Sequence, residues 1–329
     1  MRKAIFDPVK VGVVGLGSFG RQHALTLAGI VEARLVALVA RRQASLDAVG
    51  NDLPGVPGWL DLDQAIAESE AEAWVVASST RSHVPIAKKL LAAGKTVLLE
   101  KPISGDLTEA ESLIPLVKPD SSNLMMGHIV LFNSEFLTLQ DEVRRRGPIR
   151  FISCERHRPA AYVARFPGET PMHLTMVHDL YSVLALVDRA EPTGFSSQAH
   201  FTPEGACDLV LAQLRWPNGM LTSFSASLMT PEGMAPNGFD LLEVFGDGWA
   251  ARTRSNPRPI EVWDDRARWP MVLEIRADPA GPTGMMASEL RAFCRVVRGL
   301  QPVPLGASYA DAIQVQRWMD RLQKCWTEC

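Results

Sequence analysis

The sequence predicts an α/β protein that begins with a Rossmann domain, a doubly wound parallel sheet with helices on both faces. A short, nearly all-apolar strand at residues 9–14 runs directly into a glycine-rich turn and a helix. Apolar strands at residues 32–40, 73–77 and 96–99 then alternate with helical stretches, a pattern typical of parallel sheets. From Gly194 onward strand patterns dominate, which indicates a second unit of different architecture.

The length and composition fit a two-domain protein of the cytoplasm. The 329 residues suggest two domains, and a hydrophobic content of 47% is enough for two cores. A net charge of −3 provides no basic surface for nucleic acid. The five cysteines have no CxxC or His–Cys spacing, so we expect a reducing compartment and no metal site. No apolar run reaches the roughly 18 residues of a membrane helix, and Asp7 and Pro8 argue against a signal peptide.

The turn at residues 15–20 has the GxGxxG pattern. In a Rossmann fold the first glycine permits a tight turn, the second lets the backbone approach a pyrophosphate, and the third lets helix and strand pack closely. The following helix N-terminus offers free N–H groups and partial positive charge to a phosphate. Because the pattern follows a strand and opens a helix, it predicts a dinucleotide site rather than a purely structural turn. The cofactor residues expected here are Gly15, Gly17, Ser18, Phe19 and Gly20.

The end of the second strand indicates which nicotinamide cofactor is preferred. An acidic residue at this position binds the ribose 2′-hydroxyl of NAD, whereas arginine accepts the 2′-phosphate of NADP. Here Ala40 is followed by Arg41 and Arg42, and the first carboxylate after them is Asp47. We therefore expect NADP to be preferred over NAD. The alternative is that both arginines are solvated loop charges.

Small polar residues follow the third strand, at the sheet edge where open α/β sheets bind ligands. A helix is predicted over residues 83–93, with Ser82 as its N-cap and Gly94 after its end. His83 is a candidate contact to the cofactor, the alternative being a surface histidine of the first helical turn. The other candidate cofactor residues of this segment are Ser78, Ser79 and Thr80.

The fourth strand ends in Glu100-Lys101-Pro102, which places a carboxylate and an amine at the same edge. The proline biases Lys101 away from helical geometry and so favours an extended turn. A lysine there can donate a proton or a hydrogen bond to a substrate oxygen and stabilise developing negative charge. The alternative is a solvated Glu–Lys pair.

Together these motifs resemble the Gfo/Idh/MocA family, the group of glucose–fructose oxidoreductases, inositol dehydrogenases and sugar-nucleotide dehydrogenases. The similarity extends over essentially the whole chain, and its matching stretches are residues 11–20, 73–104, 126–136 and 241–249. The resemblance implies an NAD(P)-dependent dehydrogenase with an N-terminal Rossmann domain and a C-terminal α+β domain built on a large, mostly antiparallel open sheet. In the family that sheet makes oligomer contacts, so a homodimer or homotetramer is expected.

The resemblance also implies a domain division and roles for the Glu-Lys-Pro turn. We expect a dinucleotide-binding domain at residues 1–128 and a substrate-binding and oligomerisation domain at residues 129–329, whose last helix is free to pack back on the first domain. The family lysine contacts substrate and nicotinamide, which maps to Lys101. The family glutamate contacts the cofactor ribose, which maps to Glu100.

Candidate substrate residues lie in the second domain. His178-Asp179 matches the end of a family Asp-x-x-x-His-Asp pattern on a helix, but Leu174 stands where the first aspartate is usual. Asn133 is retained from the family stretch GHIxRFNP. Arg158 belongs to an arginine-rich segment that could bind a substrate carboxylate or phosphate, the alternative being ordinary surface arginines. For His178, the alternative is a satisfied core histidine.

These expectations describe an enzyme that transfers a hydride between nicotinamide and a secondary alcohol or ketone of a sugar, polyol or sugar derivative, a small-molecule substrate. Lys101 polarises the substrate oxygen in this hypothesis, and His178 carries the hydroxyl proton. The alternative is a non-catalytic NAD(P)-binding sensor or regulatory protein that keeps the fold. Leu174 favours that alternative, whereas the retention of Lys101 and His178 argues against it.

Overall fold

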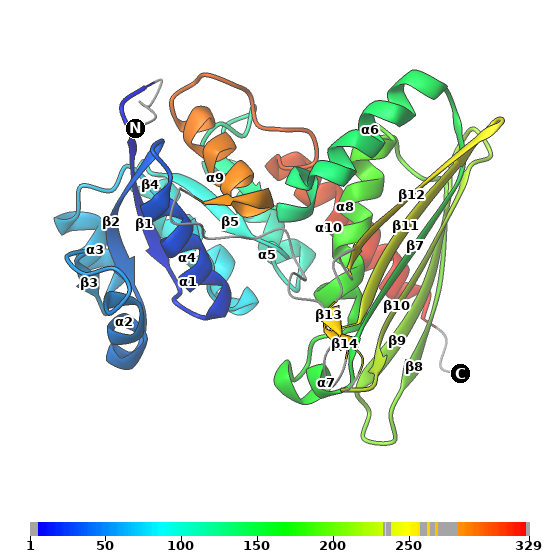
Figure 1. The fold of residues 1–329 in the computed structure, drawn as a ribbon, viewed down its shortest axis with the longest axis horizontal. Helices are drawn as coiled ribbons and strands as arrows, with labels where there is room; N and C mark the ends of the chain where they lie inside the picture. Colours follow the sequence, from blue (N-terminus) through cyan, green and yellow to red (C-terminus); the bar gives the residue numbers. More distant parts are fainter. Residues whose placement is uncertain are drawn as a thin grey trace. The chain divides into compact units, whose positions relative to one another are not determined.

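The structure is a computed structural model, and it describes residues 6–232, 234, 238–256, 262–263, 267–268 and 282–326. Contacts divide the chain into two compact units (Figure 1). The first unit contains residues 1–132 and 275–313, and the second contains residues 133–274 and 314–329. The helix at residues 284–297 thus groups with the first unit, although the sequence division assigns it to residues 129–329. The division into a dinucleotide-binding domain at residues 1–128 and a substrate-binding and oligomerisation domain at residues 129–329 stays a prediction.

The first unit is built on a parallel sheet with the strand order β3-β2-β1-β4-β5-β6. The order runs outward in both directions from β1 and β4, so right-handed crossovers place helices on both faces. This arrangement confirms the predicted doubly wound Rossmann sheet. Its strands are β1 (Val9–Val14), β2 (Ala33–Val39), β3 (Gly58–Trp59), β4 (Ala73–Val76), β5 (Thr96–Glu100) and β6 (Leu124–Gly127).

The strands of this sheet are apolar because both faces are covered. All four residues of β4 are fully buried, and so are Val97, Leu98 and Leu99 of β5. The helical segments of the unit are α1 (Ser18–Gly29), α2 (Gln43–Gly50), α3 (Leu62–Glu68), α4 (Thr80–Ala92), α5 (Leu107–Glu111), η1 (Ile114–Leu116), η2 (Ile129–Phe132) and α9 (Gly284–Val297).

Helix α4 begins at Thr80, three residues before the predicted start at residue 83. Ser79 is its N-cap residue with extended backbone, so Ser82, the predicted cap, lies in the first turn instead. The Ser82 hydroxyl contacts Ser78 Oγ at 2.9 Å and the Ser79 carbonyl oxygen at 2.8 Å. Several neighbouring serines can each hydrogen-bond nearby backbone groups. The sequence alone therefore could not show which serine is the N-cap residue.

The second unit is built on a mixed, mostly antiparallel sheet with the order β12-β11-β7-β10-β9-β8. Among the described strands of this sheet, only β7 and β10 pair in parallel. The predicted second architecture is thereby confirmed. The strands are β7 (Ile149–Pro159), β8 (Gly194–Phe201), β9 (Cys207–Arg215), β10 (Leu221–Thr230), β11 (Phe239–Gly246) and β12 (Trp249–Asn256), with a separate pair β13 (Val262–Trp263) and β14 (Ala267–Arg268).

One face of this sheet packs on helices (Figure 1), and the other carries exposed side chains. Alternation along β9 buries Val210, Ala212 and Leu214, and leaves Leu211 44% exposed on the opposite face. The Trp216 and Trp318 rings meet edge to face at 5.6 Å on the helix side. The helices of the unit are α6 (Ser134–Arg146), α7 (Ala161–Arg165), the π-helix η3 (Met172–Met176), α8 (Val177–Leu186) and most of α10 (Tyr309–Lys324).

Among the described helices, none combines the length and the apolar composition that a membrane crossing requires.

Candidate active site

The glycine turn between β1 and α1 uses each glycine for a different reason. Gly15 has φ = +89°, which favours glycine, and an added Cβ would lie 2.7 Å from the Ser78 backbone. A Cβ on Gly20 would lie 1.8 Å from the Gly15 carbonyl oxygen, so only hydrogen fits there. Gly17 is exposed and has no atom within 4 Å of its Cβ position. Steric contacts inside the protein therefore explain why Gly15 and Gly20 are glycines. They do not explain why Gly17 is a glycine, so the reason must lie outside the protein's own packing.

The N-terminus of α1 suits a phosphate group. Gly17 is the N-cap residue, no side chain caps the helix, and its first turn contains no acidic residue. Ser18 is exposed and Phe19 is half-buried at this end. Uncapped N–H groups and the positive end of the helix dipole bind anions. The open space at Gly17 and this bare terminus fit the pyrophosphate of a dinucleotide, as the GxGxxG pattern predicts.

His83 joins the turns that follow β4 and β5. Its Nδ1 lies 2.7 Å from the Pro102 carbonyl oxygen, and its Nε2 lies 3.1 Å from the Ser78 carbonyl oxygen. The side chain is buried, and burial lowers the pKa of His83 despite these two acceptors. The alternative of a surface histidine is therefore wrong. Ser79 is exposed and Ser78 and Thr80 are half-buried at the same strand end.

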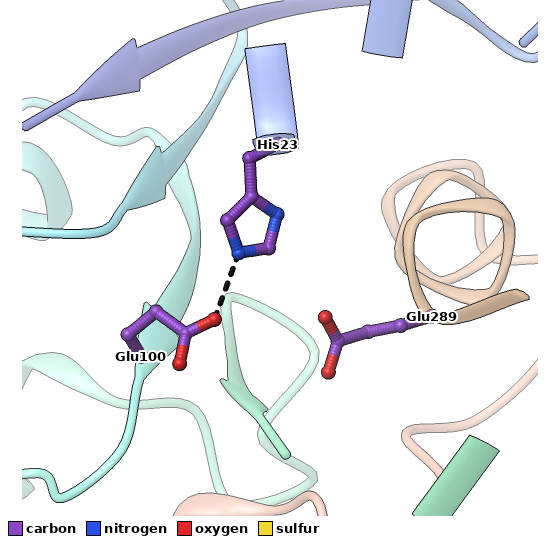
Figure 2. Close-up of side chains that lie close together, drawn as sticks. All are labelled: His23, Glu100 and Glu289. Carbon is purple, nitrogen blue, oxygen red and sulfur yellow. Dashed lines mark hydrogen bonds and ion pairs between the residues drawn. The ribbon is translucent and has the colours of Figure 1, made fainter. Parts of the chain in front are cut away.

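Glu100 and Lys101 follow β5 at the carboxyl edge of the sheet. Glu100 is buried, and its Oε1 lies 2.8 Å from Nε2 of His23 on α1 (Figure 2). Its Oε2 accepts a hydrogen bond from the Lys101 backbone N–H at 3.3 Å. Lys101 is half-buried, and the Lys101–Pro102 peptide bond is cis. A solvated Glu–Lys pair is thus excluded, because the carboxylate lies inside the protein and pairs with a histidine.

Arg41 and Arg42 lie at the same edge, directly after β2. Both side chains are exposed, and Arg42 is the N-cap residue of α2. The first turn of α2 contains no acidic residue. Parallel strands bring their carboxyl ends to one edge of a sheet, so the turns after β1, β2, β4 and β5 gather there. This edge holds all of the candidate cofactor residues of the first unit.

In the second unit, the neighbouring residues His178 and Asp179 differ in burial and in their partners. His178 is half-buried, whereas Asp179 is fully buried and pairs with Arg156 of β7, with Arg156 Nη2 2.8 Å from Asp179 Oδ1. Burial raises the pKa of Asp179, and Arg156 opposes that shift. Leu174, at the usual aspartate position, lies in the π-helix η3. The structure thus gives Asp179 a partner inside the unit.

Arg158 takes part in the same buried network. Its Nη1 lies 2.6 Å from Asp240 Oδ1 on β11, and Arg156 Nη1 lies 3.1 Å from Asp240 Oδ2. Burial works against ionisation of Asp240, but the two arginines outweigh it and lower the pKa of that carboxyl. Two arginines and two aspartates therefore balance one another under the sheet, and they fix α8 to β7 and β11.

Asn133 has a local structural role as the N-cap residue of α6. Its Oδ1 accepts hydrogen bonds from the backbone N–H groups of Glu135 at 2.9 Å and Phe136 at 3.0 Å. The sequence pattern Asn-Ser-Glu is an ordinary capping signal, which the family comparison obscured.

Sequence reasoning missed three buried ionisable residues that lie next to candidate site residues or to the buried ion-pair network: His23, Asp240 and Glu289. His23 follows Gly20 by three positions in α1, and Glu289 lies in α9, far along the chain. Asp240 is the second residue of strand β11. Of the three, Asp240 offered a signal, because it is a charged residue in an otherwise largely apolar strand and buried charge requires a partner.

The parallel sheet and the bare terminus at Gly17 have the arrangement of a Rossmann domain suited to bind a dinucleotide. Residues 9–128 match the model of the Gfo/Idh/MocA family, described as an oxidoreductase family with an NAD-binding Rossmann fold. The resemblance inferred from the motifs is thereby confirmed.

Relatives extend the similarity into the second unit. The chain is 26% identical over 267 residues to inositol 2-dehydrogenase of Rhizobium meliloti, covering 77% of this chain and 78% of that protein. It is 27% identical over 224 residues to UDP-N-acetylglucosamine 3-dehydrogenase of Acidithiobacillus ferrooxidans, covering 68% of each. Scyllo-inositol dehydrogenase from Lactobacillus casei, solved with NAD(H) and scyllo-inositol, has a TM-score of 0.80 at 19% identity and 97% coverage of both chains. That likeness shows a shared fold.

The glycines provide a matched test of the cofactor site. Gly17→Ala should leave the melting temperature unchanged, because its Cβ meets no atom of the protein. It should weaken NAD(P) binding by about tenfold or more, the equivalent of a clash of roughly 1–3 kcal/mol with the pyrophosphate. Gly20→Ala should instead destabilise the fold, because its Cβ overlaps a backbone oxygen. Thermal melts and cofactor titrations check both, and unchanged cofactor binding by Gly17→Ala would refute the site.

The buried network of the second unit should be important for stability. Asp240→Asn leaves Arg156 and Arg158 without a shared carboxylate, and should cost about 3–5 kcal/mol of unfolding free energy. Asp247→Asn is the control, because its ion pair with Arg150 is exposed and its loss should change stability little. Urea denaturation measures both variants, and equal effects would contradict the assigned importance of the network.

Proposed function

We propose that the protein is an NAD(P)-dependent dehydrogenase that transfers a hydride between nicotinamide and a secondary alcohol or ketone of a sugar, polyol or sugar derivative. The observation that carries the proposal is the Glu100-Lys101 turn, which lies on the same sheet edge as the glycine turn. Relatives named inositol 2-dehydrogenase and UDP-N-acetylglucosamine 3-dehydrogenase support alcohol groups of ring compounds as the substrate class.

Lys101 is the residue that we assign to the substrate oxygen. Its backbone is held by the buried Glu100 carboxylate and by the turn into Pro102, whose carbonyl oxygen contacts His83. A fixed backbone limits the positions that the Lys101 ammonium group can reach. This restriction favours the stabilisation of a substrate oxygen that gains negative charge. The nicotinamide, when bound, supplies or accepts the hydride. Lys101 then stabilises the alkoxide character of the oxygen.

His178 is the residue that we assign to the hydroxyl proton. An imidazole titrates near neutral pH and can take up and return a proton. It lies in the first turn of α8, which the Arg156–Asp179 pair fixes to β7. Asp179, Arg158 and Asn133, which the sequence offered as substrate residues, have partners inside the second unit, so we assign them to holding the fold around His178.

Arg41 and Arg42 support a preference for NADP over NAD. Both are exposed at the carboxyl end of β2, where the adenosine ribose lies in Rossmann enzymes, and the first turn of α2 brings no carboxylate to repel a 2′-phosphate. A guanidinium binds phosphate with two parallel hydrogen bonds. NAD remains usable in this proposal, because nothing at the site depends on the phosphate.

The exposed face of the second sheet supports self-association. Leu211, Leu221 and Phe245 lie on this face with exposed fractions of 44%, 51% and 38%. Large apolar side chains gathered on one face indicate a protein contact. A second copy of the chain, packed sheet to sheet, would bury them in a homodimer or homotetramer.

A second candidate function is a non-catalytic sensor that binds NAD(P). Leu174 favours it, because a leucine cannot tune the proton affinity of His178. Absorbance at 340 nm with NADP or NAD, across a panel of inositols, sugars and sugar nucleotides, separates the two. Turnover of a panel member supports the enzyme, and cofactor binding without turnover of any member supports the sensor.

Replacement of Lys101 tests its role directly. Lys101→Ala should lower turnover by roughly 100-fold, a typical loss for one catalytic group, and should leave the cofactor affinity nearly unchanged. Lys95→Ala is a matched control, because its Nζ hydrogen-bonds the Ala71 carbonyl oxygen away from the carboxyl edge of the sheet. Steady-state kinetics and cofactor titration measure both variants. A Lys101→Ala enzyme with full activity would remove the lysine from the mechanism.

The NADP preference depends on the two arginines. The double substitution Arg41→Ala and Arg42→Ala should weaken NADP binding far more than NAD binding, because only NADP carries the 2′-phosphate. The preference should also decrease with added salt, since the side chains are exposed. Fluorescence titration with both cofactors provides the measurement. Equal losses for NADP and NAD would contradict the preference.

A further inference from the structure

Glu289 of α9 is a buried carboxyl group that the proposed mechanism does not use. Its side chain has no exposed surface. Neither of its carboxyl oxygens has a hydrogen-bond partner among the described residues. A buried carboxylate without a partner is strongly unfavourable, so such a group must carry a proton or face a cation.

The groups that face Glu289 in the first unit are His23 of α1 and Glu100 of β5. One ligand-type atom from each of the three side chains lies within 4.8 Å of the other two. Figure 2 shows the Glu289 carboxyl group pointing from α9 toward His23 and Glu100. These three side chains come from segments far apart in the sequence, and they lie close together next to the Glu100-Lys101 turn.

The charges of the cluster favour a neutral Glu289. Glu100 already holds the available histidine, with 2.8 Å between His23 Nε2 and Glu100 Oε1. A second carboxylate nearby would meet only repulsion from the first. Burial, reinforced by the Glu100 charge, raises the pKa of Glu289 well above its ordinary value. The group is then a carboxylic acid with an O–H to donate.

The same three side chains also present ligand atoms of the kinds that bind divalent metals. Two observations favour the proton over a metal. His23 Nε2 is engaged with Glu100, and His23 Nδ1 is buried without a hydrogen-bond partner among the described residues. A metal-binding histidine normally donates its second ring N–H to an acceptor, and none of the described groups accepts it here.

We propose that Glu289 is a positioning residue, a neutral carboxylic acid that lies beside Glu100, can turn its O–H toward that carboxylate and, with His23, fixes the Glu100-Lys101 turn. The inference rests on the proposed role of Lys101. Glu100 Oε2 accepts the Lys101 backbone N–H at 3.3 Å, so the orientation of the Glu100 carboxylate determines the position of Lys101. A third group that holds this carboxylate prevents its rotation toward another donor.

Two substitutions of Glu289 separate this role from simple packing. Glu289→Leu keeps the volume but removes the donor, and should lower kcat by about 10-fold to 100-fold through a misplaced lysine, with little change in the KM for cofactor. Glu289→Gln keeps a neutral donor and should recover most of that loss. Glu68→Gln, an exposed carboxylate of α3, is the control for removal of a charge. Loss by Gln as large as by Leu would overturn the proposal.

A double substitution tests the route through Lys101. In a Lys101→Ala background, Glu289→Leu should have no further effect on kcat, because the group it positions is gone. Full additivity of the two losses would overturn the route.

Infrared spectroscopy of the whole protein tests the proton without reference to activity. The wild type should show the C=O stretch of a buried carboxylic acid at neutral pH, and Glu289→Gln should lose it. An absent band, or one tightly bound divalent metal per chain in the purified wild type that Glu289→Gln loses, would overturn the neutral acid. If the wild type turned over no substrate of the panel, the proposed function would fail, whereas the infrared result would still decide the state of Glu289.

Discussion

The close contact between Gly20 and the Gly15 carbonyl oxygen is the constraint on which the first unit depends. No side-chain atom fits between them, because a Cβ on Gly20 would lie 1.8 Å from that oxygen. The contact sets the direction in which α1 leaves β1, and so aims the helix N-terminus at the edge where β4 and β5 also end. His23, one turn into the same helix, then reaches Glu100. One backbone approach thus determines both the direction of the uncapped helix N-terminus and the surroundings of the Glu-Lys turn.

Much of this unit could be predicted from the sequence, since its signals are local. Apolar strands, a GxGxxG turn and Glu-Lys-Pro at a strand end are each read within a few residues, and the parallel sheet brings them to one edge. The partners of the candidate residues could not be predicted, because they arise from distant segments. Glu100 pairs with a histidine 77 positions earlier, and Asp179 with an arginine 23 positions earlier.

The second unit shows how pairing changes the interpretation of a charged residue. Arg158 and Asp179 have the chemistry to bind a substrate, but each is held by an opposite charge within the unit. A buried network of two arginines and two aspartates satisfies its own charges and has little capacity left for a ligand. Asp240, which completes it, lies on a strand whose alternation identified only its apolar neighbours.

The π-helix η3 changes how spacing along this segment should be compared with relatives. The Val177 N–H donates to the Met172 carbonyl oxygen, five residues back rather than four. The wider turn accommodates one residue more than an α-helical turn does, as a single-residue insertion into a regular helix would. Counting back four positions from His178 to Leu174 assumes regular geometry that the backbone lacks here. Counting back with one residue skipped for the wider turn reaches His173 instead of Leu174 as the residue that faces His178 in the expected pattern.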